Sequence, residues 1–310
     1  MILKLIVDTD CGTDDLLALA YLIAHPAIEI EAIVTVRGLA SARQGAINLT
    51  KVLTRLGIEN IPIHVGSEAP LGEFRQFPSS WVTQTESLDT LQLPVPTLEI
   101  STISAREFYR GRLVEQSGAT ILALGPLTNL ARVLEDNNVS ANASNLNFIC
   151  MGGAIDAPGN LGGGGEFRTE NRYAEWNFFI DPLAVSKVFA SNASILLVPL
   201  DATNQVPIRP SLLAGLRSTT PSPAAKISLE ILDGVSNWIS EGHYFAWDPL
   251  AAVLVSEPVP AFQSLLCLRI ELDGIFSGRL VRDVNGREVS AYLHADLRNF
   301  ERAFCSVLGV

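Results

Sequence analysis

The sequence predicts an α/β protein with an open, mostly parallel central sheet flanked by helices. Short apolar runs typical of buried strands alternate with stretches whose apolar residues recur at helical spacing. Hydrophobic residues make up 48% of the 310 residues, which is enough to fill a sizeable core. No internal repeat or composition shift marks a linker, so we expect a single domain over residues 1–310.

The expected elements follow one another along the whole chain. Strands are predicted at residues 2–7, 28–36, 61–65, 119–124, 146–151, 194–200, 264–272, 278–284 and 289–294. Helices are predicted at residues 16–22, 40–56, 127–134, 182–190, 224–239 and 298–308. Asp181 and Asp248 each directly precede a proline, so both are candidate helix N-caps.

Two segments are expected to be irregular. Residues 68–96 are punctuated by proline and glycine and are too long for a mere connector. This segment contains Trp81, which either anchors it to the core or stacks on a ligand. Residues 152–165 are rich in glycine, but no Lys-Ser or Lys-Thr pair follows as in a phosphate-binding loop, so we expect a flexible lid.

An acidic turn follows the first predicted strand. Asp8, Asp10, Asp14 and Asp15 place four carboxylates within eight residues, between a buried strand and the first helix. First-turn carboxylates that complement the helix dipole would explain two of them. Asp8 and Asp10 alternate along the strand end and would repel each other unless a cation or a shared proton relieves them. The oxygen ligands suit a hard cation such as Ca²⁺ or Mg²⁺.

Composition narrows the class of partner and the compartment. A net charge of −11 argues against nucleic acid, whose phosphates would be repelled, but not against a nucleoside. The four cysteines are scattered and indicate neither a disulfide framework nor a zinc site. The apolar start is too short for a signal peptide and no segment approaches a membrane span, so we expect a cytoplasmic protein without a membrane partner.

Five motifs, taken together, resemble the nucleoside hydrolase family. The N-terminal family pattern Asp-x-Asp-x-Gly-x-Asp-Asp is matched throughout by residues 8–15. The other four occur in family order at residues 124–129, 151–154, 174–177 and 247–251. The resemblance implies the family's fold, with its Rossmann-like core, and hydrolysis of the N-glycosidic bond of ribonucleosides. It also implies a homodimer or homotetramer.

The resemblance also assigns roles to particular residues. It implies a Ca²⁺ ion held by Asp10, Asp15, Asp248 and the backbone carbonyl of Leu124, with Asp10 as general base on a water bound to that ion. It implies contacts to the ribose from Asp14, Asn160, Glu175, Asn177 and Asp248. Asn171 competes with Asn160 for one of these contacts because the intervening insertion is long.

The leaving base is expected to lie between two indoles. Where many relatives have a histidine before the last aspartate, this chain has Trp247, and His243 lies four residues earlier. The chain is similar here to the purine-preferring branch, in which two tryptophans sandwich the base, and Trp81 and Trp247 are the matching candidates. Stacking would favour the larger purine surface and ease its departure.

Other departures from the pattern keep alternatives open. Leu39 stands where the family commonly has asparagine, and Asn204 where relatives often carry histidine. One alternative is therefore a nucleoside-binding protein with reduced turnover. A second takes Asp8 and Asp10 as the acidic pair of a haloacid dehalogenase-like phosphohydrolase, for which the helical Lys187 is a poor match to the required lysine.

Overall fold

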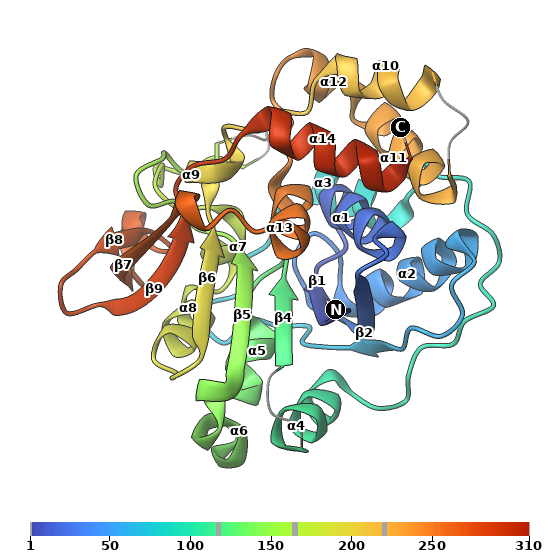
Figure 1. The fold of residues 1–310 in the computed structure, drawn as a ribbon. Coiled ribbons are helices and arrows are strands. Elements are labelled where there is room, and N and C mark those ends of the chain that lie inside the picture. The colour runs from blue at the N-terminus through green and yellow to red at the C-terminus, as the bar shows by residue number, and fades with distance from the viewer. Residues whose placement is uncertain (1, 116–118, 163–166, 219–221, 310) are drawn as a thin grey trace.

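The computed structural model describes residues 2–115, 119–162, 167–218 and 222–309, and it confirms the predicted α/β class. Nine strands form one sheet in the order β3-β2-β1-β4-β5-β6-β9-β7-β8 (Figure 1). Their bounds are β1 Leu3–Thr9, β2 Ile28–Thr35, β3 Ile63–Val65, β4 Ala119–Ala123, β5 Leu146–Met151, β6 Ser194–Val198, β7 Gln263–Ile270, β8 Leu280–Arg282 and β9 Arg287–Tyr292.

The sheet is parallel from β3 to β9, and only β7 runs antiparallel to its neighbours β8 and β9. From β1 the chain proceeds outward through β2 and β3, and then returns to the other side of β1 with β4, β5 and β6. The strand order therefore reverses between β1 and β4. In open α/β sheets, ligands bind at the carboxyl ends of the strands beside such a reversal.

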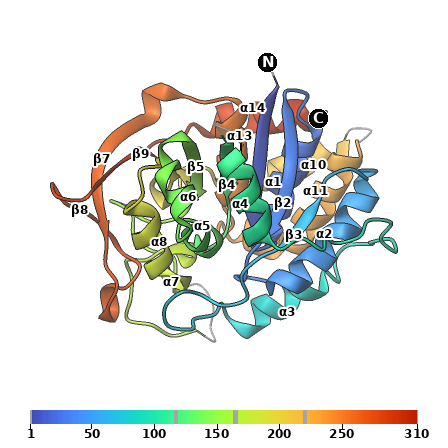
Figure 2. The ribbon, with the colours of Figure 1, turned by 90° about the horizontal axis from the view of Figure 1, so that it is seen from below.

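Helices cover both faces of the sheet (Figures 1 and 2). Their bounds are α1 Thr13–Ala24, α2 Ala42–Leu56, α3 Ser79–Ser87, α4 Ala105–Glu115, α5 Thr128–Val133, α6 Asn137–Ala141, α7 Trp176–Ile180, α8 Pro182–Phe189, α9 Leu200–Thr203, α10 Pro210–Ser218, α11 Pro223–Gly234, α12 Ser236–Ser240, α13 Trp247–Ser256 and α14 Leu297–Leu308. Short 3-10 turns lie at Ala143–Asn145, Pro260–Phe262 and Gly274–Phe276.

Alternation along β1 divides the core in two. Leu5 and Val7 pack with α1, α2, α11, α13 and α14, whereas Ile6 packs with α4, α5 and α8 on the opposite face. Successive side chains of a strand point to opposite faces, so an apolar run of this kind is expected of a strand covered on both sides. No helix within the described ranges is long and apolar enough to cross a membrane.

Two predicted segments differ from the structure. The segment 68–96 is not wholly irregular, because it contains α3, which carries Trp81. The single helix predicted over 224–239 is broken at Val235 into α11 and α12. Amphipathic spacing continued across this break, so periodicity alone did not reveal it. Part of the glycine-rich segment predicted as a lid, residues 163–165, lies outside the described residues.

Candidate active site

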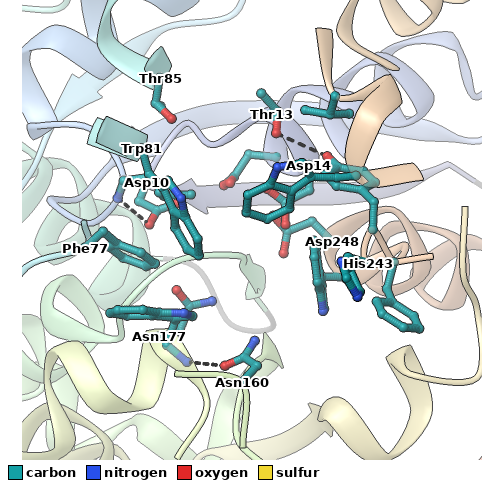
Figure 3. Close-up of a pocket in the computed structure, with 18 of the residues that line it drawn as sticks. Asp10, Thr13, Asp14, Phe77, Trp81, Thr85, Asn160, Asn177, His243 and Asp248 are labelled. Carbon is teal, nitrogen blue, oxygen red and sulfur yellow. Dashed lines mark hydrogen bonds between the residues drawn. The ribbon is translucent and has the colours of Figure 1, made fainter. Parts of the chain in front are cut away.

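A cavity of about 850 Å³ lies beside the point where the strand order reverses. The cavity is lined by every residue to which the family resemblance assigned a direct role: Asp10, Asp14, Asp15, Trp81, Leu124, Asn160, Glu175, Asn177, Trp247 and Asp248. In the view of Figure 3, Trp81 lies on one side of the cavity and His243 on the other. Residues from both ends of the chain therefore meet in one site.

The acidic turn is held in shape by Asp15. Its carboxylate accepts hydrogen bonds from the Thr9 hydroxyl and, at 2.9 Å, from the Gly12 N–H, while the Cys11 N–H donates to Thr9 Oγ1 at 3.0 Å. Cys11 adopts a φ of 64°, in the left-handed region that non-glycine residues seldom enter. A tight turn of this kind brings the following carboxylates back over the end of β1.

Asp10 is positioned by the segment after β2. Its Oδ2 accepts the Leu39 N–H at 2.9 Å. A Cβ atom on Gly38 would lie 1.9 Å from the same oxygen, so only glycine permits this approach. Asp15 lies close enough to Asp10 for repulsion between the two carboxylates to raise the pKa of Asp10.

Asp248 reaches the same cluster from the C-terminal half of the chain. Asp14, Asp15 and Asp248 each place one carboxylate oxygen within 4.8 Å of the others. Helix α13 begins at Trp247 with Ala246 as its N-cap, so the N-cap alternative for Asp248 is wrong. Its Oδ1 is buried without a hydrogen-bond partner among the described residues. By contrast, Asp181 is an N-cap as predicted and accepts the Ala184 N–H.

Without a bound cation, the carboxyl groups of Asp10, Asp14 and Asp248 are harder to ionise than carboxyl groups in water. Burial, reinforced by repulsion from Asp15, raises the pKa of Asp10 and of Asp248 well above 3.8. The same two causes raise the pKa of Asp14 to about 7. A cation would remove this repulsion and satisfy the unpaired oxygen of Asp248. Because the donors are all oxygen atoms, the cluster fits a hard divalent ion.

Leu124 and Asn177 connect this cluster to the opposite wall. Leu124 follows β4, and its N–H donates to the Asp8 carbonyl at 2.8 Å. Its own carbonyl accepts the Asn177 side-chain amide at 2.8 Å. A carbonyl oxygen has two lone pairs, so Leu124 can accept this bond and still offer an electron pair to a cation.

Glu175 and Asn160 lie on that opposite wall. Glu175 caps α7 and accepts backbone N–H groups from Gly153, Asn177 and Phe178, while burial raises its pKa to about 7. Asn160 accepts the Trp176 N–H at 3.2 Å and lines the cavity. The competing Asn171 does not line the cavity. Its side chain instead bonds Ser277, Tyr173 and Ala174.

Aromatic residues form two groups on the cavity wall. Trp81 packs edge-on against Trp176 and Trp238, with ring centroids 5.7 and 5.3 Å apart. Trp247 packs against Tyr244 and Phe245 at 5.3 and 5.9 Å. Trp176 and Trp238 also line the cavity, although neither was predicted from the sequence as a site residue. Trp176 lies inside a recognised motif, whereas Trp238 lies in a predicted amphipathic helix, where an aromatic residue is expected to face the core.

Asp8 does not line the cavity, and its contacts are to buried side chains of the protein core. It is buried and accepts hydrogen bonds from the Tyr109 hydroxyl at 2.7 Å and from Asn129 Nδ2 at 3.0 Å. Burial outweighs these bonds and raises its pKa to about 7. Leu39 and Asn204, which depart from the family pattern, both line the cavity.

Comparison with known proteins finds the same family across almost the whole chain. Residues 5–302 match the family described as inosine-uridine preferring nucleoside hydrolase. Uridine nucleosidase 1 of Arabidopsis thaliana is 31% identical over 286 residues, covering 90% of this chain and 82% of the relative. The pyrimidine-specific ribonucleoside hydrolase RihA of Shewanella sp. (strain MR-4) is 30% identical over 230 residues, covering 74% of this chain and 68% of the relative.

Solved structures share the fold. A purine-preferring ribonucleoside hydrolase from Gardnerella vaginalis superposes with a TM-score of 0.86 at 22% identity, covering 99% of this chain and 98% of that chain. A plant nucleoside hydrolase, PpNRh1, gives a TM-score of 0.84 at 24% identity, covering 98% of both chains.

Proposed function

The chain belongs to the inosine-uridine preferring nucleoside hydrolase family, and from this premise we propose that it is a Ca²⁺-dependent enzyme that converts purine ribonucleosides to free base and ribose. Hydrolysis of an N-glycosidic bond follows from the family itself. The cation, the preferred base and the role of each residue are our proposals. The observation that carries them is the convergence of carboxylates from the β1–α1 turn and α13 on one cavity.

Asp10, Asp15, Asp248 and the Leu124 carbonyl would hold the cation. Asp15 and Asp248 belong to the group of carboxylates whose oxygens lie within 4.8 Å of one another, and Asp14 is the third member of that group. The unpaired oxygen of Asp248 and the repulsion that Asp10 receives from Asp15 support adding Asp10 to the ligands. When bound, a divalent cation lowers the pKa of a coordinated water and orients the ribose hydroxyls.

Asp10 is the proposed general base. The Leu39 N–H donates to Oδ2 and fixes the orientation of the Asp10 carboxylate, which takes a proton from the attacking water. As the water attacks C1′, the bond to the base nitrogen breaks and positive charge develops on the ribose ring. The carboxylates of Asp14 and Glu175 stabilise this charge because they line the same cavity.

Asp14, Asn160, Glu175, Asn177 and Asp248 are the proposed ribose contacts. Glu175 and Asn177 are fixed by the start of α7, and Asn160 is fixed by its bond to the backbone of that helix. Hydroxyl groups donate to carboxylates and accept from amides, so this set can bind a polyhydroxylated sugar. Contacts held by secondary structure are more exact than contacts held by free loops.

Trp81 and Trp247 are the proposed walls of the base site. The names of the relatives state different preferences, which include uridine, pyrimidine and purine nucleosides. Purine preference is supported here by two aromatic groups on one cavity, because a bicyclic base offers them more stacking surface.

We further propose a homodimer or homotetramer in the cytoplasm. The family resemblance supports this assembly, and Leu265 and Val284, which expose 64% and 91% of their surface near β7 and β8, are candidate contact residues. The four cysteines are free, as expected in a reducing compartment. Light scattering coupled to gel filtration measures the oligomeric state, and a monomer would contradict the proposal.

A single substrate panel tests the activity. The protein is incubated with inosine, adenosine, guanosine, uridine and p-nitrophenyl phosphate, with Ca²⁺ or with a chelator, and ribose and phosphate are measured. We expect Ca²⁺-dependent ribose release, faster from purine nucleosides than from uridine. Tight nucleoside binding without products would favour the binding-protein alternative. Phosphate release would favour a phosphohydrolase, although no lysine among the described residues lines the cavity.

A further inference from the structure

The substrate cavity is lined by an excess of acidic side chains over basic ones. Six carboxyl groups line it: Asp10, Asp14, Asp15, Glu175, Glu241 and Asp248. No lysine or arginine lines it among the residues that the structure describes. A divalent cation would offset two of the six formal charges. The cavity therefore favours positive substrates and disfavours phosphorylated ones, since partly buried charges are weakly screened.

Aromatic rings line the part of this cavity proposed for the base. Trp81 and Trp238 meet edge-on at 5.3 Å, and Trp247 packs against Tyr244 at 5.3 Å. The face of an indole ring attracts cations more strongly than the other aromatic rings do. A flat, positively charged base could contact both aromatic groups.

Among the described residues that line the cavity, no buried histidine stands beside the aromatic groups to protonate the leaving base. The indole N–H of Trp247 donates hydrogen bonds but is not an acid at neutral pH. The histidine that lines the cavity is His243, whose side chain is 72% exposed and lies 3.6 Å from Glu241. A neutral base leaves as an anion unless it gains a proton, whereas a base that carries a fixed positive charge leaves neutral without one.

We propose that this site also hydrolyses N-ribosides of cationic heteroaromatic bases, such as pyridinium ribosides, and this inference rests on the proposed function. Water oxygen forms a bond to C1′, and the C1′–N bond breaks with its electron pair remaining on nitrogen. That pair neutralises the ring, so the base departs uncharged. The water proton passes to Asp10 and then to solvent, and the products are ribose, a neutral base and one proton.

The first experiment compares inosine with nicotinamide riboside, a pyridinium riboside, in the presence of Ca²⁺. Ribose release is measured after subtraction of the rate without enzyme, and Asp10→Ala serves as the inactive control. We expect ribose from both substrates with the wild-type protein. Release from inosine alone overturns this inference and leaves the proposed function intact. Release from neither overturns both, and release from nicotinamide riboside alone supports the inference while overturning the purine preference.

A second experiment separates binding from the intrinsic lability of cationic ribosides. Nicotinamide and 1-methylnicotinamide differ by one methyl group and one positive charge, and neither has a glycosidic bond. We expect 1-methylnicotinamide to inhibit inosine hydrolysis with an inhibition constant at least about tenfold lower, as for a desolvated cation–π contact. Equal inhibition constants would overturn the proposal.

A matched pair of variants tests whether negative charge in the cavity causes the difference between the inhibition constants of nicotinamide and 1-methylnicotinamide. Glu241 lines the cavity and Glu257 does not, and both are exposed glutamates. Glu241→Gln is expected to raise the inhibition constant of 1-methylnicotinamide by about threefold or more, whereas Glu257→Gln is expected to leave it unchanged. If both variants leave the constant unchanged, the electrostatic basis of the proposal is wrong.

Discussion

The Leu39 backbone N–H donates a hydrogen bond to Asp10 Oδ2 at 2.9 Å. The sequence drew attention to Leu39 because its side chain cannot make the polar contact of the asparagine expected there. The main chain, however, still holds the proposed general base, and this contact does not depend on the side chain. The departure at Leu39 therefore leaves Asp10 in position, which argues against loss of turnover as its consequence.

Asp10→Ala is the most direct test of the mechanism. Removing a general base costs about 10²- to 10⁴-fold in rate, so kcat for inosine should fall by roughly 10³-fold. Nucleoside binding should remain measurable by calorimetry, because the proposed ribose contacts on α7 are unchanged. Asp89→Asn, on an exposed residue outside the cavity, is the control. Full activity of Asp10→Ala would refute the mechanism.

Gly38→Ala tests whether the position of Asp10 matters as well as its presence. The new methyl group would lie 1.9 Å from Asp10 Oδ2, so the carboxylate must move. A displacement of about 1 Å can cost roughly 100-fold in rate, and we expect a loss of that order in kcat. Gly111→Ala meets no atom within 4 Å and lies in α4. This control should retain full activity and gain up to about 1 kcal/mol in stability. Equal kcat values for both variants would contradict the argument.

The fold could be predicted from sequence because its signals are local. Leu5, Ile6 and Val7 are three consecutive apolar residues, as expected of a strand covered on both faces. Helix α3 was missed because it is short and only one of its residues, Thr85, is buried, so it lacks a continuous apolar face. The break at Val235 was missed for the opposite reason, because apolar spacing continues across it.

The site was predictable only where a motif identified it. The sequence pattern of a helix start made both Asp181 and Asp248 candidate N-caps, since each precedes proline. The structure separates them, because Asp181 bonds the backbone of its own helix whereas Asp248 leaves an unpaired oxygen in the acidic cluster. Long-range partners of this kind depend on tertiary packing, which no local pattern reports.

Asp181→Ala should lower stability strongly. Asp181 is fully buried and accepts hydrogen bonds from the Leu71 N–H at 2.8 Å, the Thr128 hydroxyl at 2.7 Å and the Ala184 N–H at 3.1 Å. Its loss leaves two buried donors and one partly buried donor without a partner, so we expect a cost of about 3 kcal/mol in the free energy of unfolding. Asp136 caps α6 near the surface, and Asp136→Ala should cost about 1 kcal/mol. Urea denaturation compares them, and a smaller loss for Asp181→Ala would contradict this account.

Trp247→Ala tests the proposed stacking of the base. Because a purine offers more surface to the indole than a pyrimidine does, kcat/KM for inosine should fall about tenfold more than kcat/KM for uridine. Phe74→Ala removes an aromatic ring that is 56% exposed and does not line the cavity, so both substrates should be unaffected. Equal losses for the two nucleosides in Trp247→Ala would rule out stacking as its role.

Removal of the cation should make stability depend on pH in a defined direction. Burial and repulsion from Asp15 raise the pKa of Asp10 and Asp248 well above 3.8, and that of Asp14 to about 7. The folded chain therefore holds protons that the unfolded chain releases above about pH 4. Stability in chelator should fall as pH rises from 5.5 to 8, by about 1.4 kcal/mol per pH unit for each proton that the folded chain still holds, and the contribution of Asp14 levels off above about pH 7.

Calcium should reverse this loss, because the ion replaces the protons. The increase in Tm on adding Ca²⁺ is therefore expected to be larger at pH 8 than at pH 5.5, where the ion must first displace protons from the same oxygens. Differential scanning calorimetry at both pH values, with and without chelator, measures this difference. Asp248→Asn, which removes one proposed ligand, should abolish most of the Ca²⁺-induced increase. If Ca²⁺ raised Tm equally at both pH values, or equally in Asp248→Asn, the ion would be binding somewhere other than the acidic cluster.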